Sequence, residues 1–162
     1  MAVRYSTGCF NKLLGTASLK DIFADGVINI YTGTQPSLAD NAATGTLLAT
    51  VTVDAGAFAA GVATNGLEFD APVGAVISKA AAENWKYTGG TAGTAGWFRL
   101  VGNAADGHNQ WETSSPEASS TTLPRIDGSI GVSSGDMRLS NVNIAVGAPG
   151  TIDEFNITLS NP

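Results

Sequence analysis

The chain has 162 residues, of which 14% are charged and 43% hydrophobic, and its formal net charge at pH 7 is −6. Ordinary soluble domains carry roughly 25% charged residues, so this surface must consist largely of small polar and apolar side chains, which suit permanent packing against other subunits. The acidic balance argues against nucleic-acid binding and against contact with an anionic membrane, because both require a cluster of basic side chains.

The length is sufficient for one domain with a sizeable core, so we expect residues 1–162 to form a single domain. The single cysteine, Cys9, excludes an internal disulfide, and its apolar neighbours favour a buried, unreactive thiol. No apolar run approaches the ~20 residues of a membrane-spanning helix, and the N-terminus lacks a signal-peptide core. We therefore expect a protein that is made and assembled in a cytoplasm.

Residues 5–25 form the one segment with clear helical spacing, and Phe10, Leu13 and Leu14 fall on one face of it. We expect this amphipathic segment to cover one end of a β core or to dock on a neighbouring subunit. The three side chains are therefore candidate interface residues.

Local signals predict where this helical segment is interrupted. Ser18 and Asp21 have the spacing of a capping box, which predicts a second helix start. Gly15 predicts a break or a kink, and Gly26 predicts the C-terminal end.

Residues 27–160 alternate short apolar segments with Gly, Pro and Ser turns, a pattern that is typical of an all-β core. Strands are predicted at 27–31, 47–53, 67–69, 73–79, 84–87, 96–103, 125–132, 137–141, 142–146 and 151–160, with Pro149 and Gly150 in a turn. Short strands at this spacing favour an antiparallel β-sandwich or a jelly-roll-like barrel, here with a short N-terminal helical segment.

The segment 96–103 is predicted to be a central strand of this core. Because side chains alternate along a strand, Phe98 and Leu100 share one face, and Trp97, Arg99 and Val101 share the other. We expect Phe98 and Leu100 to lie in the core and Arg99 to face outward or toward a partner.

A long loop is predicted at 104–122, where no hydrophobic periodicity is visible. It contains Trp111, which in a polar loop either folds back onto the domain or anchors a partner. We hypothesise an intersubunit or host-facing contact through Trp111, with His108 in the same loop. His108 has no second His or Cys nearby, so a zinc site is not predicted and a solvated histidine is the simpler interpretation.

Two further patterns resemble catalytic motifs. Residues 131–135 read Gly-Val-Ser-Ser-Gly and match a nucleophile elbow, but their strand–turn–strand context favours a hairpin turn. Glu68 and Asp70 would share one strand face, where carboxylates can act on sugars or bind Ca²⁺, although a solvated face is the simpler interpretation. We expect no catalytic residues, no cofactor and no metal, and hence a protein that is not an enzyme.

Several stretches, spread over most of the chain outside 104–122, indicate a resemblance to a known family. They are Arg4-Tyr-Ser-Thr-Gly, Asn11-Lys-Leu-Leu-Gly, Ser18-Leu-Lys-Asp-Ile-Phe-Ala-Asp-Gly, Ile28-Asn-Ile-Tyr-Thr-Gly-Thr-Gln-Pro, Ala95-Gly-Trp-Phe-Arg-Leu-Val-Gly, Leu123-Pro-Arg-Ile-Asp-Gly-Ser-Ile-Gly and Asp136-Met-Arg-Leu-Ser. Through them the chain resembles a family of small structural proteins of tailed bacteriophages. The resemblance implies a virion component without enzymatic activity, assembled in the host cytoplasm.

Within that class, a capsid decoration (cement) protein on the head surface is the first expectation, with the phage major capsid protein as its partner. Closed oligomers are common at symmetry axes, so we expect a homo-oligomer, a trimer first and a dimer second. The alternative is a tail, neck or baseplate component. A receptor- or glycan-binding module is the competing class, and Trp85 and Trp111 are the candidates for its aromatic platform.

Overall fold

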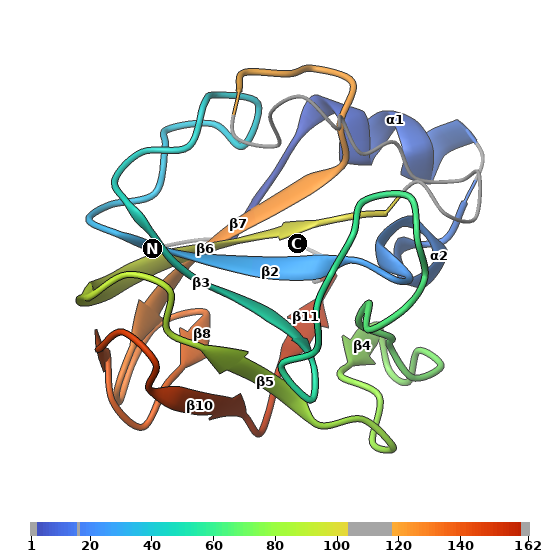
Figure 1. The fold of residues 1–162 in the computed structure, drawn as a ribbon. Helices are drawn as coiled ribbons and strands as arrows, with labels where there is room; N and C mark the ends of the chain where they lie inside the picture. Colours follow the sequence, from blue (N-terminus) through green and yellow to red (C-terminus); the bar gives the residue numbers. More distant parts are fainter. Residues whose placement is uncertain (1–2, 16, 104–117, 160–162) are drawn as a thin grey trace.

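The computed structural model describes residues 3–15, 17–103 and 118–159 (Figure 1). After the two-residue strand β1 (Arg4–Tyr5), the chain forms helix α1 (Thr7–Gly15) and helix α2 (Leu19–Phe23). The predicted capping box is confirmed: Ser18 accepts from the Asp21 backbone N–H, and the Asp21 side chain accepts from the Ser18 backbone.

The predicted stop at Gly26 is wrong, because α2 already ends at Phe23 and Asp25 adopts the positive φ of 56°. Gly26 has a different role. A Cβ at this position would lie 2.3 Å from the Val101 carbonyl oxygen, so only glycine permits this close approach of the chain to the sheet.

The core is a nine-stranded, mainly antiparallel sheet with the order β1-β7-β6-β2-β3-β5-β10. Its long strands are β2 (Val27–Thr32), β3 (Leu47–Val53), β5 (Trp85–Thr88), β6 (Gly93–Val101), β7 (Arg125–Gly131) and β10 (Pro149–Ile152). Two short strands lie outside this order: β8 (Met137–Arg138) pairs with β7 in parallel, and β9 (Asn143–Ile144) pairs with β6. A separate two-stranded sheet contains β4 (Val76–Ser78) and β11 (Asn156–Thr158). The predicted all-β fold with a short N-terminal helical segment is confirmed, and the sandwich or jelly-roll connectivity stays a prediction.

Several strand predictions need correction. The segment 67–69 makes only isolated bridges, and 73–79 shortens to β4. The segment predicted as one strand at 151–160 contains β11 and the end of β10, and Pro149 and Gly150 lie in β10 rather than in a turn. β10 is an edge strand that pairs only with β5, and edge strands tolerate a proline.

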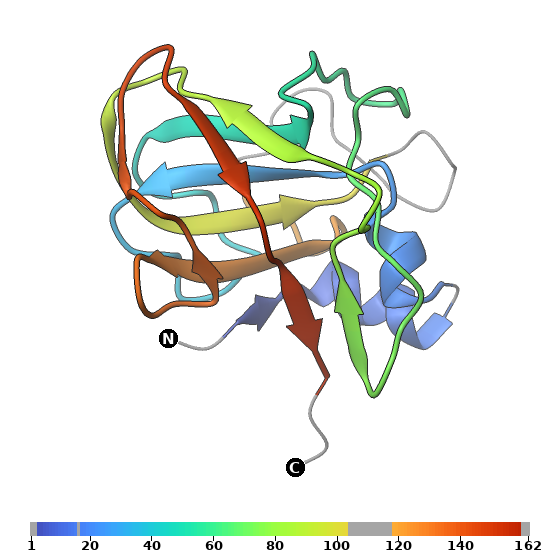
Figure 2. The same cartoon turned by 90° about the horizontal axis from the view of Figure 1, so that it is seen from below.

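The central strands are buried on both faces. On one face, Ile28, Ile30, Phe98, Leu100 and Ile126 belong to the main hydrophobic core. β5, β8, β10 and β11 lie on this side, and seen from below β10 and β11 run across it (Figures 1 and 2). On the other side lie α1, the connection from β2 to β3, and the chain that leads into β7 (Figure 1). The second face is therefore covered by loops and a helix instead of water.

Candidate functional site

Two of the three sequence-predicted interface residues of α1 lie on the surface of the molecule, and the third packs partly against the core. Leu14 is 88% exposed and Phe10 is 51% exposed, whereas Leu13 is half-buried. We call these three side chains the α1 surface. Trp111 and His108 lie outside the described residues.

The opposite side of α1 is held tightly to the body of the protein. The Ser6 hydroxyl donates to the Leu123 carbonyl (2.8 Å) and accepts from the Cys9 backbone N–H (3.1 Å), and Thr7 binds the Asp40 carboxylate through its backbone N–H and its hydroxyl. At Gly8, a Cβ would lie 2.4 Å from the Thr122 carbonyl oxygen, so glycine is required for this packing.

Cys9 is fully buried beneath α1, as predicted. Burial raises the pKa of its thiol from 9.0 to about 12, so that the thiol stays protonated well above neutral pH. A protonated, inaccessible thiol is a poor nucleophile, so Cys9 contributes packing rather than reactivity.

An apolar groove of about 210 Å³ adjoins the α1 surface. Leu13 from α1, Leu19 from α2, Ile77 from β4, and Ile157 and Leu159 at the C-terminal end line it. Leu159 is 46% exposed, so the groove and the α1 surface together present apolar side chains from three parts of the chain.

The expectation that Arg99 faces outward is wrong. Arg99 is fully buried and forms two hydrogen bonds to Asp127 on the neighbouring strand, from Nε to Oδ1 and from Nη2 to Oδ2, both 2.7 Å long. Nη2 also donates to the Asn41 carbonyl at 3.0 Å, and the guanidinium lies 5.4 Å from the centre of the Trp97 ring. The residues that connect β2 to β3 cover this face, so the arginine binds within the chain.

A second arginine enters the same buried region. Arg125 is fully buried, and none of the described residues accepts a hydrogen bond from its Nε, Nη1 or Nη2. Burial, together with the nearby Arg99 guanidinium, lowers the pKa of Arg125 to about 10. Burial also raises the pKa of Asp127, an effect opposed by the hydrogen bonds from Arg99. The carboxylate of Asp127 therefore acts on two buried positive charges, and Asp40 adds a weaker attraction to that of Arg125.

The predicted aromatic platform is not present at Trp85, which is fully buried. Its ring packs edge-on against Phe69 with centroids 5.3 Å apart, and its Nε1 donates to the Glu83 carboxylate at 2.7 Å. Trp85 is a core residue and cannot stack on a sugar ring.

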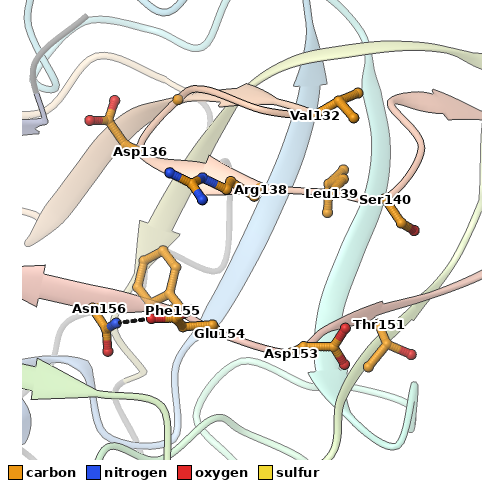
Figure 3. Close-up of a pocket in the computed structure, with 11 residues that line it drawn as sticks. Val132, Asp136, Arg138, Leu139, Ser140, Thr151, Asp153, Glu154, Phe155 and Asn156 are labelled. Atoms are coloured by element: carbon orange, nitrogen blue, oxygen red, sulfur yellow. Dashed lines mark hydrogen bonds between the residues drawn. The ribbon is translucent and has the colours of Figure 1, made fainter.

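A polar groove of about 460 Å³ lies between the segments 132–140 and 151–156 (Figure 3). Asp136, Arg138, Asp153 and Glu154 supply its charged side chains, and Glu154 accepts a hydrogen bond of 2.7 Å from the Asn156 amide. Sequence reasoning missed this groove because its two walls come from segments that are distant in the chain.

Neither catalytic pattern forms a site in the described structure. Residues 131–135 lead from β7 through a turn into β8, without the helix that a nucleophile elbow requires. Glu68 and Asp70 alternate with the buried Leu67 and Phe69. Asp70 is exposed, whereas Glu68 is half-buried, and burial raises the pKa of its carboxyl group. Within residues 3–15, 17–103 and 118–159, no three His, Cys, Asp or Glu side chains converge to hold a metal ion. Both helices described are too short to cross a bilayer.

Comparisons with protein-family models, with curated proteins and with solved structures found no match for this chain. A function is therefore inferred from the surfaces described above and from the sequence.

Proposed function

We propose that this protein is a non-enzymatic structural component of a tailed-bacteriophage virion that decorates the capsid by binding the major capsid protein. The observation that carries the proposal is the α1 surface. Leu14 and Phe10 expose large apolar side chains on a helix that Ser6, Thr7 and Gly8 hold in a fixed position. A rigid apolar surface loses little conformational entropy when it binds a partner, which favours binding.

The low charge of the chain and its resemblance to phage structural proteins support the same proposal. A surface poor in charged side chains loses little hydration when it is buried in a permanent assembly. The apolar groove beside α1 extends the surface that a partner could cover. A placement in the tail, neck or baseplate is the alternative, because the same surface could bind proteins there.

Reconstitution with phage heads that lack this protein tests the proposal. We expect the purified protein to co-sediment with such heads, and Leu14→Lys to weaken binding about 10-fold or more, since burying a leucine side chain contributes about 1.5–3 kcal/mol. Val146→Lys is the matched control, because Val146 is 69% exposed and does not belong to the α1 surface.

Equal binding of heads by Leu14→Lys and Val146→Lys would show that the α1 surface does not bind the capsid. Failure of the unaltered protein to bind heads, with binding to purified tails instead, would replace decoration by the tail alternative.

A further inference from the structure

The polar groove separates two strand segments whose facing edges lack pairing partners. One wall is β8 with the residues that follow it, and the other is the chain from the end of β10 into β11 (Figure 3). The hydrogen bonds of each wall determine which backbone groups face the groove.

On the first wall, β8 uses alternate residues to bind β7. Leu139 donates its backbone N–H to the Gly131 carbonyl (3.1 Å), within a parallel pairing that places Arg138 beside Gly131. Met137 and Leu139 therefore direct backbone groups toward β7, and Arg138, which lies between them, directs its own to the opposite side. Ser140 follows directly after Leu139, beyond the end of β8. Both Arg138 and Ser140 line the groove, and no described residue forms a backbone hydrogen bond with either on that side.

On the second wall, β11 uses alternate residues to bind β4. The Phe155 carbonyl accepts from the Lys79 N–H (2.9 Å), and Ile157 lies opposite Ile77. Phe155 and Ile157 therefore direct their backbone groups toward β4, whereas Glu154 and Asn156 direct theirs away from it. Glu154 and Asn156 line the groove, and in the described part of the chain their backbone groups have no partner.

Unpaired strand edges are templates for pairing with another chain. We propose that the polar groove binds an extended, basic segment of another protein chain, which adds as a strand and pairs with Arg138 and Ser140 on one edge and with Glu154 and Asn156 on the other. Main-chain hydrogen bonds would supply affinity, as in other cases of strand addition.

The charges around the groove determine what kind of segment fits. Asp153 and Glu154 contribute two carboxylates against the single guanidinium of Arg138, so the groove favours a positively charged occupant. The Asp136 carboxylate accepts hydrogen bonds from the backbone N–H and the hydroxyl of Ser129. Asp153 and Glu154 are exposed, whereas Phe155 lies at the inner side of the groove and is 3% exposed. The fitting sequence therefore alternates apolar side chains, directed inward, with Lys or Arg, directed outward beside the carboxylates.

This inference goes beyond the proposed function and does not depend on it, because the groove and the α1 surface are formed by different residues. Binding of a partner through the α1 surface would not change the prediction for the groove. Binding of a peptide in the groove would likewise not change the prediction for the α1 surface.

The test uses the purified protein and the synthetic peptide Lys-Val-Lys-Val-Lys-Val-Lys, studied by amide hydrogen exchange with NMR detection. We expect the peptide to slow exchange of the amides of Arg138, Ser140, Glu154 and Asn156 by about 10-fold or more. A peptide methylated at alternating backbone nitrogens can pair along one edge only, so it should not protect the amides of both walls. A peptide with Glu in place of Lys should not bind. The inference is overturned if millimolar peptide protects none of the four amides, or if the methylated peptide protects them equally.

Two variants with the same change in net charge distinguish specific binding of the peptide in the groove from general attraction of a basic peptide to an acidic protein. Asp153→Asn/Glu154→Gln and Ala81→Lys/Ala82→Lys both change the net charge by +2, at exposed positions inside and outside the groove. We expect the first variant to weaken peptide binding several-fold and the second to leave it close to that of the unaltered protein. Equal weakening by the two variants would mean that the peptide responds only to net charge, and would overturn the site.

Discussion

Arg99 and Asp127 form a fully buried ion pair that joins the two strands β6 and β7 at directly opposite positions. The pair is bidentate, and Asp127 is also the main carboxylate that offsets the buried charge of Arg125. Removing one member of such a cluster leaves positive charge in an environment that cannot solvate it.

We therefore expect Asp127→Asn to lower the free energy of unfolding by about 3–5 kcal/mol, the range for breaking a buried pair. Urea denaturation followed by tryptophan fluorescence measures this loss. Asp54→Asn is the control, because it breaks the exposed pair with Lys86 and should have a much smaller effect. Equal effects of the two variants would contradict the structural role of the buried pair.

The packing of α1 predicts opposite outcomes for two glycines in the same helix. Gly8→Ala places a methyl group 2.4 Å from the Thr122 carbonyl oxygen, so we expect it to displace α1 and to cost at least about 2 kcal/mol of stability. Gly15→Ala meets no atom within 4 Å and should be neutral or stabilising by up to about 1 kcal/mol. Thermal unfolding of the two variants compares them directly, and a well-tolerated Gly8→Ala would contradict the described contact.

Asn103 connects three backbone groups that are distant in sequence. Its amide donates to the carbonyls of Asp25 (3.0 Å) and Val62 (2.8 Å) and accepts from the Gly61 N–H (2.7 Å). We expect Asn103→Ala to cost about 1.5–4.5 kcal/mol, at about 0.5–1.5 kcal/mol for each hydrogen bond, and to speed amide exchange in residues 56–66. Asn143→Ala removes one exposed contact with Thr94 and should leave exchange in 56–66 unchanged.

The buried thiol of Cys9 predicts a specific alkaline dependence of stability. Because the folded-state pKa is raised to about 12 from 9.0, the unfolded chain loses this proton first, and the stabilisation is present below pH 9 and is lost as the pH rises toward 12. Between pH 9 and 11, the free energy of unfolding of the unaltered protein should fall more steeply than that of Cys9→Ala, by up to about 1.4 kcal/mol per pH unit. Parallel pH profiles for the two proteins would contradict the burial of the thiol.

The sequence was sufficient to predict elements whose signals are local. The strand 47–53 was predicted with the bounds of β3, and Ser18 with Asp21 identified the start of α2, because alternation and capping depend on neighbours in the chain. The shared face of Phe98 and Leu100 was correct for the same reason.

Predictions that depend on contacts between distant segments were less successful. Alternation indicated that Arg99 shares a face with Trp97, but it could not indicate that the connection from β2 to β3 covers this face. The Trp97 Nε1 donates to the Thr44 carbonyl (3.2 Å), and the Arg99 Nη2 donates to the Asn41 carbonyl. Both acceptors lie more than 50 residues before their donors in the chain. The polar groove was missed for a similar reason, since its unpaired edges become visible only when the strand pairing is known. The interface roles of Phe10, Leu13 and Leu14 stay predictions.

Gold labelling of intact virions with an antibody against this protein, viewed by electron microscopy, tests the central proposal most directly. We predict gold particles distributed over the head surface, as expected for a protein bound to the major capsid protein. Label confined to the tail, the neck or the baseplate, or virions without any label, would contradict capsid decoration.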